Sequence, residues 1–390
     1  MTEKNNRLIF ILTVGVFGIL STEMGVIGIL PSIAEQFQIS VSQAGLLVSM
    51  FALAVAISAP IMPLLFSAVN RKKVMLLVLG IFIIGNIVSI FTSNFTVLLI
   101  ARVIPAFFHP IYCSMALTVA ATSVGPDQAP KAVSKVMLGI TAGMILSLPI
   151  ANFIASEFSI QMVMLFFAVI NALAFIATIF FIPSMPVKER LSYGAQISIL
   201  KSPVIWLSIA TVIFIGSAVA SVNSYVTEYL STIADLSGGN LSVVLFLFGL
   251  ASLVGTLVAG RLLTKNAMKT VMFFPVVSGA VLLVSLVTGS SSGPIIITIL
   301  FWGFLFAIGN MISQYWLTSS APEAPDFANG LFLCCGNLGI TIGTTVGGLF
   351  ISGMGTQYIV LGGVLFMVLS LPSILLRNYL VNPTKKQLTN

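Results

Sequence analysis

The chain has 390 residues, of which 58% are hydrophobic and only 7% are charged, with a formal net charge of +7 at pH 7. Soluble globular proteins carry roughly 25% charged residues, so this chain lacks the polar side chains that a water-facing surface needs. The composition excludes a soluble protein and predicts an all-α integral membrane protein. The positive charge does not indicate nucleic-acid binding, because it follows the membrane topology.

Apolar stretches long enough to cross a bilayer recur along the whole chain. A membrane-crossing helix needs about 20 mostly apolar residues, and Pro, Gly, Asn and charged residues divide the sequence into twelve such stretches. The predicted spans are 8–30, 43–67, 74–93, 97–121, 132–154, 160–182, 205–228, 241–262, 271–289, 294–319, 329–352 and 356–380. The least apolar interval, 183–204, predicts a cytoplasmic linker between an N-terminal six-helix bundle, 1–182, and a C-terminal bundle, 205–390.

The loops alternate in charge when the N-terminus is placed in the cytoplasm. The cytoplasmic segments then hold sixteen of the seventeen Lys and Arg residues, and the outer loops hold none. These sixteen are Lys4, Arg7, Arg71, Lys72, Lys73, Lys131, Lys135, Lys188, Arg190, Lys201, Arg261, Lys265, Lys269, Arg377, Lys385 and Lys386. This pattern predicts that both termini are cytoplasmic and that the number of spans is even.

The two halves of the sequence repeat. An offset of 197 residues carries the starts of the first six spans onto the starts of the last six, to within a residue. Such a repeat predicts two six-helix bundles related by an axis along the membrane normal, with a binding site near mid-membrane. This is the architecture of an alternating-access carrier.

Other classes of membrane protein fit the sequence less well. A primary pump needs a phosphate-binding loop, and the sequence contains none. A single histidine and the lack of an H-E-x-x-H motif argue against a membrane enzyme, and no C-x-x-C pair indicates a metal site. A channel is less consistent with the repeat and its central linker than a rocking carrier is. We therefore expect no enzymatic activity, cofactor or metal.

Several motifs resemble those of the major facilitator superfamily, over nearly the whole chain. They are "STEMGVIGILPSIAEQF", "NRKK" at 70–73, "ARVIPAFFHPIY" and "GNLGITIGTTVGG". Within the superfamily the sequence looks most like bacterial drug/proton antiporters of the arabinose-efflux and purine-efflux type. The resemblance implies a twelve-helix fold in which spans one, four, seven and ten line a central cavity.

The loop after span two departs from the superfamily pattern G-x-x-x-D-x-x-G-R-K. Pro63, Ser67 and Asn70 stand at the Gly, Asp and second Gly, and only Arg71 and Lys72 remain. The counterpart after span eight keeps Gly260 but has Thr264 in place of the acid. By resemblance, Arg71, Lys72 and Arg261 are candidates for a cytoplasmic gate, although the acid that normally locks the gate is missing.

Glu23 and Arg102 are the charged residues deepest within the predicted spans. At 1.5 Å per residue both lie roughly 8–11 Å below the outer surface, so they are candidate partners. An apolar environment favours a neutral carboxylate and a guanidinium favours a charged one, so Glu23 is a candidate proton-coupling and substrate-binding residue, with Arg102 tuning it. The simpler interpretation is a static ion pair that fixes helix packing.

His109, the only histidine, follows Arg102 by two helical turns on the same helix face, about 10 Å deeper. Imidazole titrates near neutral pH, so His109 is a candidate proton relay. Alternatively, it satisfies the backbone that Pro110 disrupts.

Polar residues in the second half are candidates for substrate binding, because ligand cavities place a few polar groups in an apolar lining. They are Asn223, Tyr225, Glu228, Asn310, Gln314 and Asn337. Each is equally suited to an interhelical hydrogen bond, and Glu228 also to the outer water boundary. The glycines of span eleven are interpreted as packing residues.

The sequence thus predicts a secondary transporter that exports a small organic molecule (a drug, a sugar or a nucleobase-like compound) by proton antiport. The alternative is an uncoupled facilitator or a proton symporter for a small metabolite. The expected location is the bacterial plasma membrane. Expected partners are the substrate, protons and lipid, without nucleic acid, and the expected state is monomeric.

Overall fold

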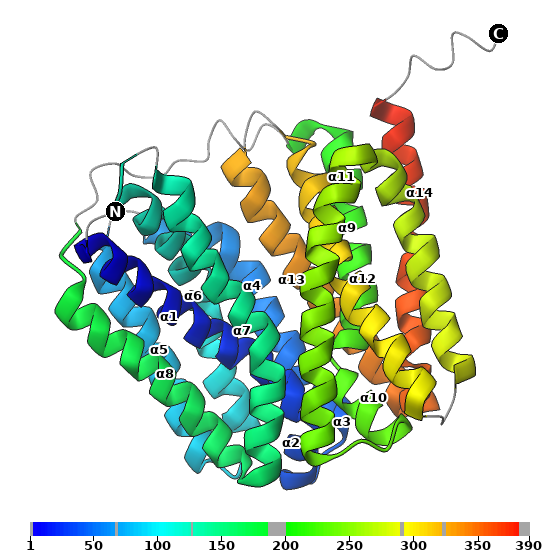
Figure 1. Cartoon of the computed structure of the whole chain (residues 1–390), viewed down its shortest axis with the longest axis horizontal. Helices are drawn as coiled ribbons and strands as arrows, with labels where there is room; N and C mark the ends of the chain where they lie inside the picture. The colour runs from blue at the N-terminus through cyan, green and yellow to red at the C-terminus, as the bar shows by residue number, and fades with distance from the viewer. Residues whose placement is uncertain are drawn as a thin grey trace. The chain divides into compact units, whose positions relative to one another are not determined.

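The computed structural model describes residues 3–66, 69–125, 128–185, 200–288, 292–321 and 325–381. Within these ranges every regular element is an α-helix or a 3₁₀ turn (Figure 1). The chain forms two compact units, one of Met1–Leu191 with Leu236–Gly249 and one of Ser192–Asp235 with Leu250–Asn390. Eleven described helical stretches are long and apolar enough to cross a membrane, which confirms the predicted all-α membrane fold. Most of the predicted linker lies outside the described residues.

The first unit contains the helices of predicted spans one to six. These are α1 (Glu3–Gly25), η1 (Val26–Ile29), α2 (Leu30–Gln36), α3 (Val41–Ala44), α4 (Leu46–Leu65), α5 (Arg71–Phe91), α6 (Phe95–Thr122), α7 (Ala129–Glu157) and α8 (Ile160–Phe181). Short polar side chains begin four of them by accepting hydrogen bonds from first-turn N–H groups: Ser40 for α3, Asn70 for α5, Asn94 for α6 and Ser159 for α8.

The second unit contains the helices of predicted spans seven to twelve, except that the first turns of α11 belong to the first unit. These helices are α9 (Pro203–Asn223), α10 (Val226–Ile233), α11 (Gly238–Thr288), α12 (Ser292–Thr318), α13 (Pro325–Met354), η4 (Thr356–Tyr358) and α14 (Ile359–Val381).

Helix α11 accounts for the difference between twelve predicted spans and eleven observed stretches. Its 51 residues would be about 75 Å long if straight, more than twice the roughly 30 Å hydrocarbon thickness. The helix is interrupted at Asn266, whose φ of −161° and ψ of 86° are not helical. The Asn266 side chain then accepts a 3.0 Å hydrogen bond from the Lys269 N–H, as an N-cap does. The element therefore contains both predicted spans eight and nine.

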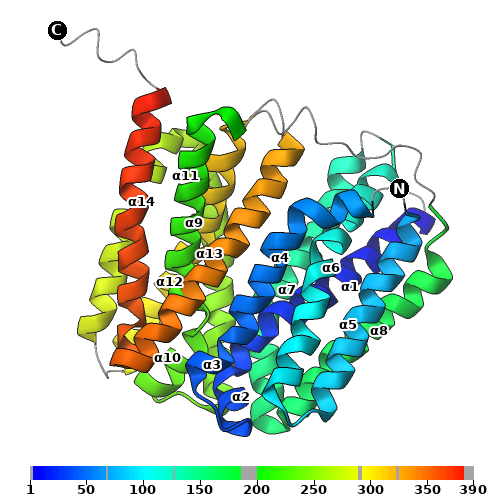
Figure 2. The same cartoon turned by 180° about the vertical axis from the view of Figure 1, so that it is seen from behind.

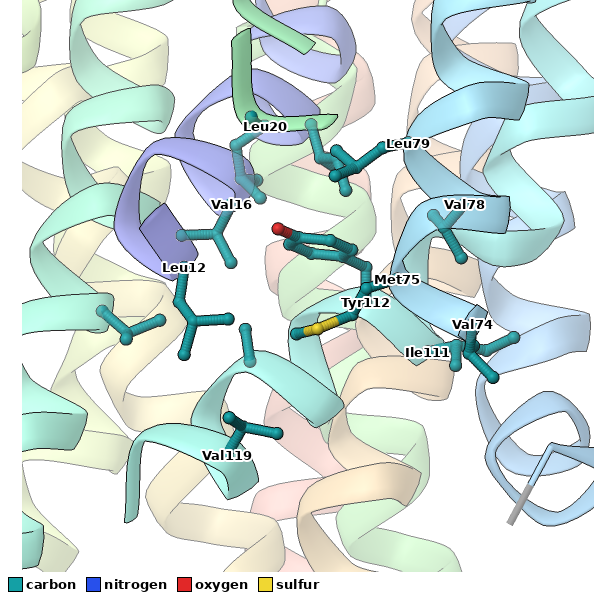
Figure 3. Close-up of a cluster of buried hydrophobic side chains, with 14 of the residues drawn as sticks. Leu12, Val16, Leu20, Val74, Met75, Val78, Leu79, Ile111, Tyr112 and Val119 are labelled. Carbon is teal, nitrogen blue, oxygen red and sulfur yellow. The ribbon is translucent and has the colours of Figure 1, made fainter. Parts of the chain in front are cut away.

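The core of the first unit forms where α1 packs against α6, α7 and α8. Helix α5 packs against both α6 and α8 (Figure 2). Figure 3 shows the Tyr112 ring of α6 among Val16 and Leu20 of α1 and Leu79 of α5. Gly15 makes this approach possible, because a Cβ at that position would lie 1.8 Å from the Tyr112 hydroxyl oxygen.

The core of the second unit forms where α9 packs against α13 and α14. Glycines of α13 allow the α9 and α13 backbones to approach closely, as small residues do in membrane bundles. A Cβ at Gly339 would lie 2.9 Å from the Ile213 carbonyl oxygen, and one at Gly343 would lie 2.2 Å from the Ser217 carbonyl oxygen. The interpretation of these two span-eleven glycines as packing residues agrees with these contacts.

Gly343→Ala is expected to lower the stability of the protein, because the new methyl group would push against a backbone oxygen that cannot rotate away. Overpacking of this kind costs about 1–3 kcal/mol. The matched control is Gly336→Ala on the same helix, where a Cβ meets nothing within 4 Å. Thermal unfolding in detergent, followed by tryptophan fluorescence, measures both variants. Equal melting temperatures for the two would contradict the packing role of Gly343.

Candidate functional site

Both halves contain a broken helix at the same place in the sequence repeat. Helix α1 ends at Gly25, two residues after Glu23, and the chain passes through η1 before α2 begins. Helix α9 ends at Asn223 and α10 begins at Val226, and the 197-residue offset carries η1 onto this interruption. Interrupted helices at corresponding positions of two repeats are the best sequence indication of a carrier's binding site. The residues around Glu23 are therefore the leading candidates for a binding site.

Glu23 contacts His109, the residue that the sequence analysis singled out as a proton relay. The Glu23 Oε2 atom lies 3.2 Å from His109 Nε2. The contact is a hydrogen bond when the imidazole is neutral and an ion pair when it is protonated. The His109 side chain is 13% exposed and that of Glu23 is 11% exposed, so the pair borders open space and is not sealed in packed protein.

The direction of the two helices explains why Glu23 meets His109, although equal depth favoured Arg102. Side chains on a helix lean toward its N-terminus. Helices α1 and α6 run in opposite directions through the predicted membrane, so the Glu23 side chain leans toward the level of His109 while His109 leans toward the level of Glu23. The described ion-pair contact of Glu23 is therefore to His109, while Arg102 interacts with Glu23 electrostatically. The role of Arg102 in tuning Glu23 remains a prediction.

Arg102 lies in the same site but contacts the backbone of α1. Its Nη2 atom donates a 2.6 Å hydrogen bond to the carbonyl oxygen of Thr22, next to Glu23. The side chain is buried at 3% exposure, and the charge of Glu23 acts on it electrostatically. A guanidinium is always protonated in proteins. Arg102 is thus a fixed cation placed one residue from the carboxylate by a hydrogen bond to the backbone.

Phe51 of α4 belongs to the site, and sequence reasoning did not identify it. The Arg102 Cζ atom lies 5.9 Å from the centre of the Phe51 ring, and the His109 ring packs on it edge to face at 6.1 Å. Cys113 approaches from the next turn of α6, with its Sγ atom 3.7 Å from His109 Nε2. A phenylalanine in an apolar span carries no sequence signal that separates it from ordinary core residues.

Three nitrogen atoms at the site are buried without a hydrogen-bond partner among the described residues. They are Nε and Nη1 of Arg102 and Nδ1 of His109. Buried polar atoms of this kind call for an explanation, and functional sites are a common one. With one fixed cation, one carboxylate and one imidazole, the site can gain or lose a proton on the Glu23–His109 pair, and its net charge then changes by one.

Two of the second-half candidates make interhelical contacts. Glu228 accepts hydrogen bonds through Oε1 from Thr232, at 2.8 Å, and from Thr356 of η4, at 3.5 Å. Tyr225 is 1% exposed, and its hydroxyl donates to the Thr344 carbonyl oxygen of α13 at 3.0 Å. These contacts join α10 to η4 and the α9 end to α13. A substrate role for either residue remains a prediction.

Asn223 and Asn337 each have a buried side-chain oxygen without a hydrogen-bond partner among the described residues. Asn337 uses its amide N–H to donate to the Leu333 carbonyl oxygen of its own helix at 2.9 Å. Asn223 is the last residue of α9, at the interruption described above. Both oxygens are therefore available as acceptors, which suits substrate contacts or bound water equally.

Gln314 lines a cavity of about 380 Å³ within the second unit. The cavity lies among α11, α12 and α13, and its other lining residues are Gly260, Leu263, Met311, Tyr315, Thr318 and Asn329. No charged residue is among them. Asn310, one turn before Gln314 on α12, is exposed but does not line this cavity.

Two of the three candidate gate residues begin α5, and the third, Arg261, lies within α11 before its interruption at Asn266. Lys72 Nζ donates a 2.8 Å hydrogen bond to the Ile179 carbonyl oxygen near the end of α8, where a cation complements the helix dipole. The Arg71 N–H donates to the Met185 carbonyl oxygen at 3.1 Å, and Arg261 is exposed on α11. The first two contacts join α5 to the end of α8 inside one unit. A gating role for the three residues remains a prediction.

Two helical repeats, each with an interrupted helix at the same position, define the class of secondary carriers. Among the described residues no group of three His, Cys, Asp or Glu side chains could hold a metal ion. The candidate site in the first unit combines a carboxylate, an imidazole and a guanidinium.

Comparison with known proteins identifies the family. The profile of the Major Facilitator Superfamily matches residues 12–344, and the chain belongs to this superfamily of membrane transporters. The uncharacterized MFS-type transporter YtbD of Bacillus subtilis (strain 168) is 30% identical over 359 residues, covering 90% of each chain. The AraJ protein of Escherichia coli (strain K12) is 26% identical over 375 residues, covering 95% of this chain and 94% of AraJ.

Solved structures show the same fold at low sequence identity. The nucleoside transporter NupG superposes with a TM-score of 0.75 at 13% identity, covering 96% of this chain and 98% of NupG. A bacterial homologue of the lysosomal transporter Spinster superposes with a TM-score of 0.77 at 13% identity, covering 97% of each chain. The predicted superfamily and fold are therefore confirmed.

Proposed function

We propose that this transporter exports a small organic molecule in exchange for protons, and that the Glu23–His109 pair is its proton site. The observation that carries the proposal is the 3.2 Å contact between Glu23 Oε2 and His109 Nε2, which lies beside an interrupted helix. Ionisable residues inside a membrane are costly and are retained chiefly for function. An imidazole and a carboxylate in contact can share one exchangeable proton between them.

Competition between proton and substrate is the simplest mechanism for this site. Arg102 remains charged throughout, so a proton on the Glu23–His109 pair leaves the buried site with one excess positive charge. Binding of substrate near Glu23 favours the state without the proton, and binding of the proton favours release of substrate. Proton entry on one side of the membrane thereby drives substrate exit on the other side. The reason is that proton and substrate favour different protonation states of the same site.

The cargo class follows from the sparse charge of the candidate binding residues. The cavity beside Gln314 has amide, hydroxyl and aromatic groups but no charged side chain. This composition suits a neutral or weakly charged molecule of modest size, such as a drug, a sugar or a nucleobase-like compound. The sequence motifs resemble those of bacterial drug/proton antiporters, which favours export over import. The loop charges support an orientation with both termini in the cytoplasm, and the likeness to a bacterial MFS-type transporter supports a location in the bacterial plasma membrane.

Ligand-induced proton release from purified, weakly buffered protein tests the proposal. The ligand panel contains cationic drugs, chloramphenicol-like neutral compounds, sugars and purines, and protein-free detergent is the control. We expect one class to release close to one proton per protein. That class is then loaded into liposomes carrying the transporter, and an imposed pH gradient establishes the direction of transport.

Two other results would replace antiport with its alternatives. Ligand binding without proton release, together with a transport rate and direction that do not depend on the pH gradient, identifies an uncoupled facilitator. Proton uptake on ligand binding, together with accumulation in the same direction as the proton flow, identifies a symporter.

A further inference from the structure

Asn152 of α7 joins two segments that are far apart in the sequence. Its Nδ2 atom donates a 3.1 Å hydrogen bond to the carbonyl oxygen of Gly28, and its Oδ1 atom accepts a 2.9 Å hydrogen bond from the Ser242 hydroxyl. The side chain is buried at 6% exposure. A carboxamide is one of the few side chains that can donate to a carbonyl and accept from a hydroxyl at once.

The hydrogen bond from Asn152 to the Gly28 carbonyl oxygen lies next to the proposed proton site. Gly28 belongs to η1, which begins three residues after Glu23. A 3₁₀ segment inside a longer helix is often a functional hinge. Gly28 lies so close to α7 that a Cβ would be 2.5 Å from the Leu148 carbonyl oxygen. A change in η1 that accompanies protonation of Glu23 therefore reaches Asn152 directly.

Ser242 places the second contact on the first turns of α11. Residues Leu236–Gly249 belong to the first unit, and the same helix continues beyond Gly249 in the residues of the second unit. This segment packs tightly on α7, because a Cβ at Gly249 would lie 2.4 Å from the Ile145 Cγ2 atom. Asn152 thus lies between the hinge beside Glu23 and a helix whose continuation belongs to the other repeat.

We propose that Asn152 is a positioning residue that couples the protonation state of Glu23 to the docking of residues 236–249 on α7. This inference rests on the proposed proton antiport, since it names the route by which the proton site controls a helix. When η1 shifts, the hydrogen bond between the Asn152 amide and the Gly28 carbonyl oxygen breaks. The Asn152 side chain then reorients and loses its hydrogen bond from Ser242. The first turns of α11 are then free to leave α7.

The groups that set the charge around Glu23 all lie on α6 among the described residues. His109 contacts Glu23 directly, Arg102 lies beside it, and Cys113 contacts His109. Phe51 of α4 is the aromatic neighbour of both Arg102 and His109. Asn152 and Ser242 do not titrate, so any pH dependence of the α11 segment has to originate at this cluster.

The docking of residues 236–249 on α7 can be measured by the alkylation rate of a cysteine placed on α7 where Gly249 packs. Ile145→Cys places a thiol where α11 covers α7, and Leu138→Cys, on an exposed face of the same helix (65% exposed), is the control. The rate of reaction with a small membrane-permeant maleimide is quantified at each position by peptide mass spectrometry between pH 5 and pH 8. Because the thiolate is the reacting species, the rate at any accessible cysteine rises with pH, and the rate at position 145 is therefore divided by the rate at position 138 at the same pH. We expect this ratio to change with pH in an otherwise native chain.

When Asn152→Leu is combined with Ile145→Cys, the alkylation rate at position 145 is expected to rise by about fivefold to tenfold, since two buried hydrogen bonds are lost. The pH dependence of that rate, relative to position 138, is expected to disappear. Ser242→Ala is expected to raise the rate as well, and Asn152→Leu with Ser242→Ala to raise it no further than Asn152→Leu alone. A merely structural amide predicts a faster rate that keeps the pH dependence of the native chain.

The outcomes separate this inference from the proposed function. If Glu23→Gln abolishes the pH dependence at position 145 while Asn152→Leu preserves it, proton coupling stands and the role of Asn152 is refuted. If Glu23→Gln leaves the pH dependence intact, the assignment of the proton site itself is wrong. Loss of the pH dependence in both variants, with the rate at position 138 unchanged, supports the coupling route.

Discussion

Glu23→Gln is expected to abolish the response of transport to a pH gradient while leaving exchange of substrate for substrate largely intact. Glutamine has nearly the shape of glutamate and keeps a hydrogen-bonding oxygen for His109, but it cannot take up or release a proton. A gradient of one pH unit supplies about 1.4 kcal/mol per proton, which sustains an accumulation of about tenfold. The variant is expected to show none of this accumulation.

Transport in liposomes separates the two activities. Accumulation of labelled substrate under an imposed pH gradient reports coupling, and exchange of internal unlabelled for external labelled substrate reports binding and conformational change alone. Glu35→Gln is the matched control, because Glu35 is an exposed carboxylate on α2, outside the site. Full gradient-driven accumulation by Glu23→Gln would move the coupling role to another residue, with His109 the next candidate.

The sequence predicted the membrane fold well because the bilayer imposes simple rules on composition. Span positions followed from length and hydropathy, and the repeat of 197 residues predicted equivalent helices in the two halves. The one departure, α11, comes from Asn266, where the turn between two spans is so tight that helical structure resumes at once. The topology of the termini follows from loop charge and remains a prediction.

The candidate site was predictable in its members but not in its contacts. Glu23, Arg102 and His109 stood out because charged or titratable side chains are rare in such a sequence, and the structure brings all three together. Their contacts depend on which way each side chain leans, so depth alone did not predict the contact between Glu23 and His109. Phe51 and Asn152 were missed because an aromatic ring or an amide within a span has the same sequence signature whether it packs or functions.

Arg102→Met is expected to destabilise the protein strongly. The substitution removes a buried cation and its hydrogen bond to the Thr22 carbonyl oxygen. It also leaves the Glu23 carboxylate without its fixed cation, and breaking a buried charge arrangement in this way costs about 3–5 kcal/mol. Thermal unfolding in detergent measures the loss of stability.

Combining Arg102→Met with Glu23→Gln distinguishes a static ion pair from a coupling site. The double variant removes both charges, so its stability at pH 8 is expected to recover by about 1–3 kcal/mol relative to Arg102→Met alone, while gradient-driven transport stays absent. Arg377→Met is the matched control, because Arg377 is a buried cation (6% exposed) that stacks on Trp316 in the second unit. Glu23→Gln should not rescue that variant. Recovery of both stability and gradient-driven transport in the double variant would mean that the two charges only fix the packing of α1 on α6, and that the proton crosses elsewhere.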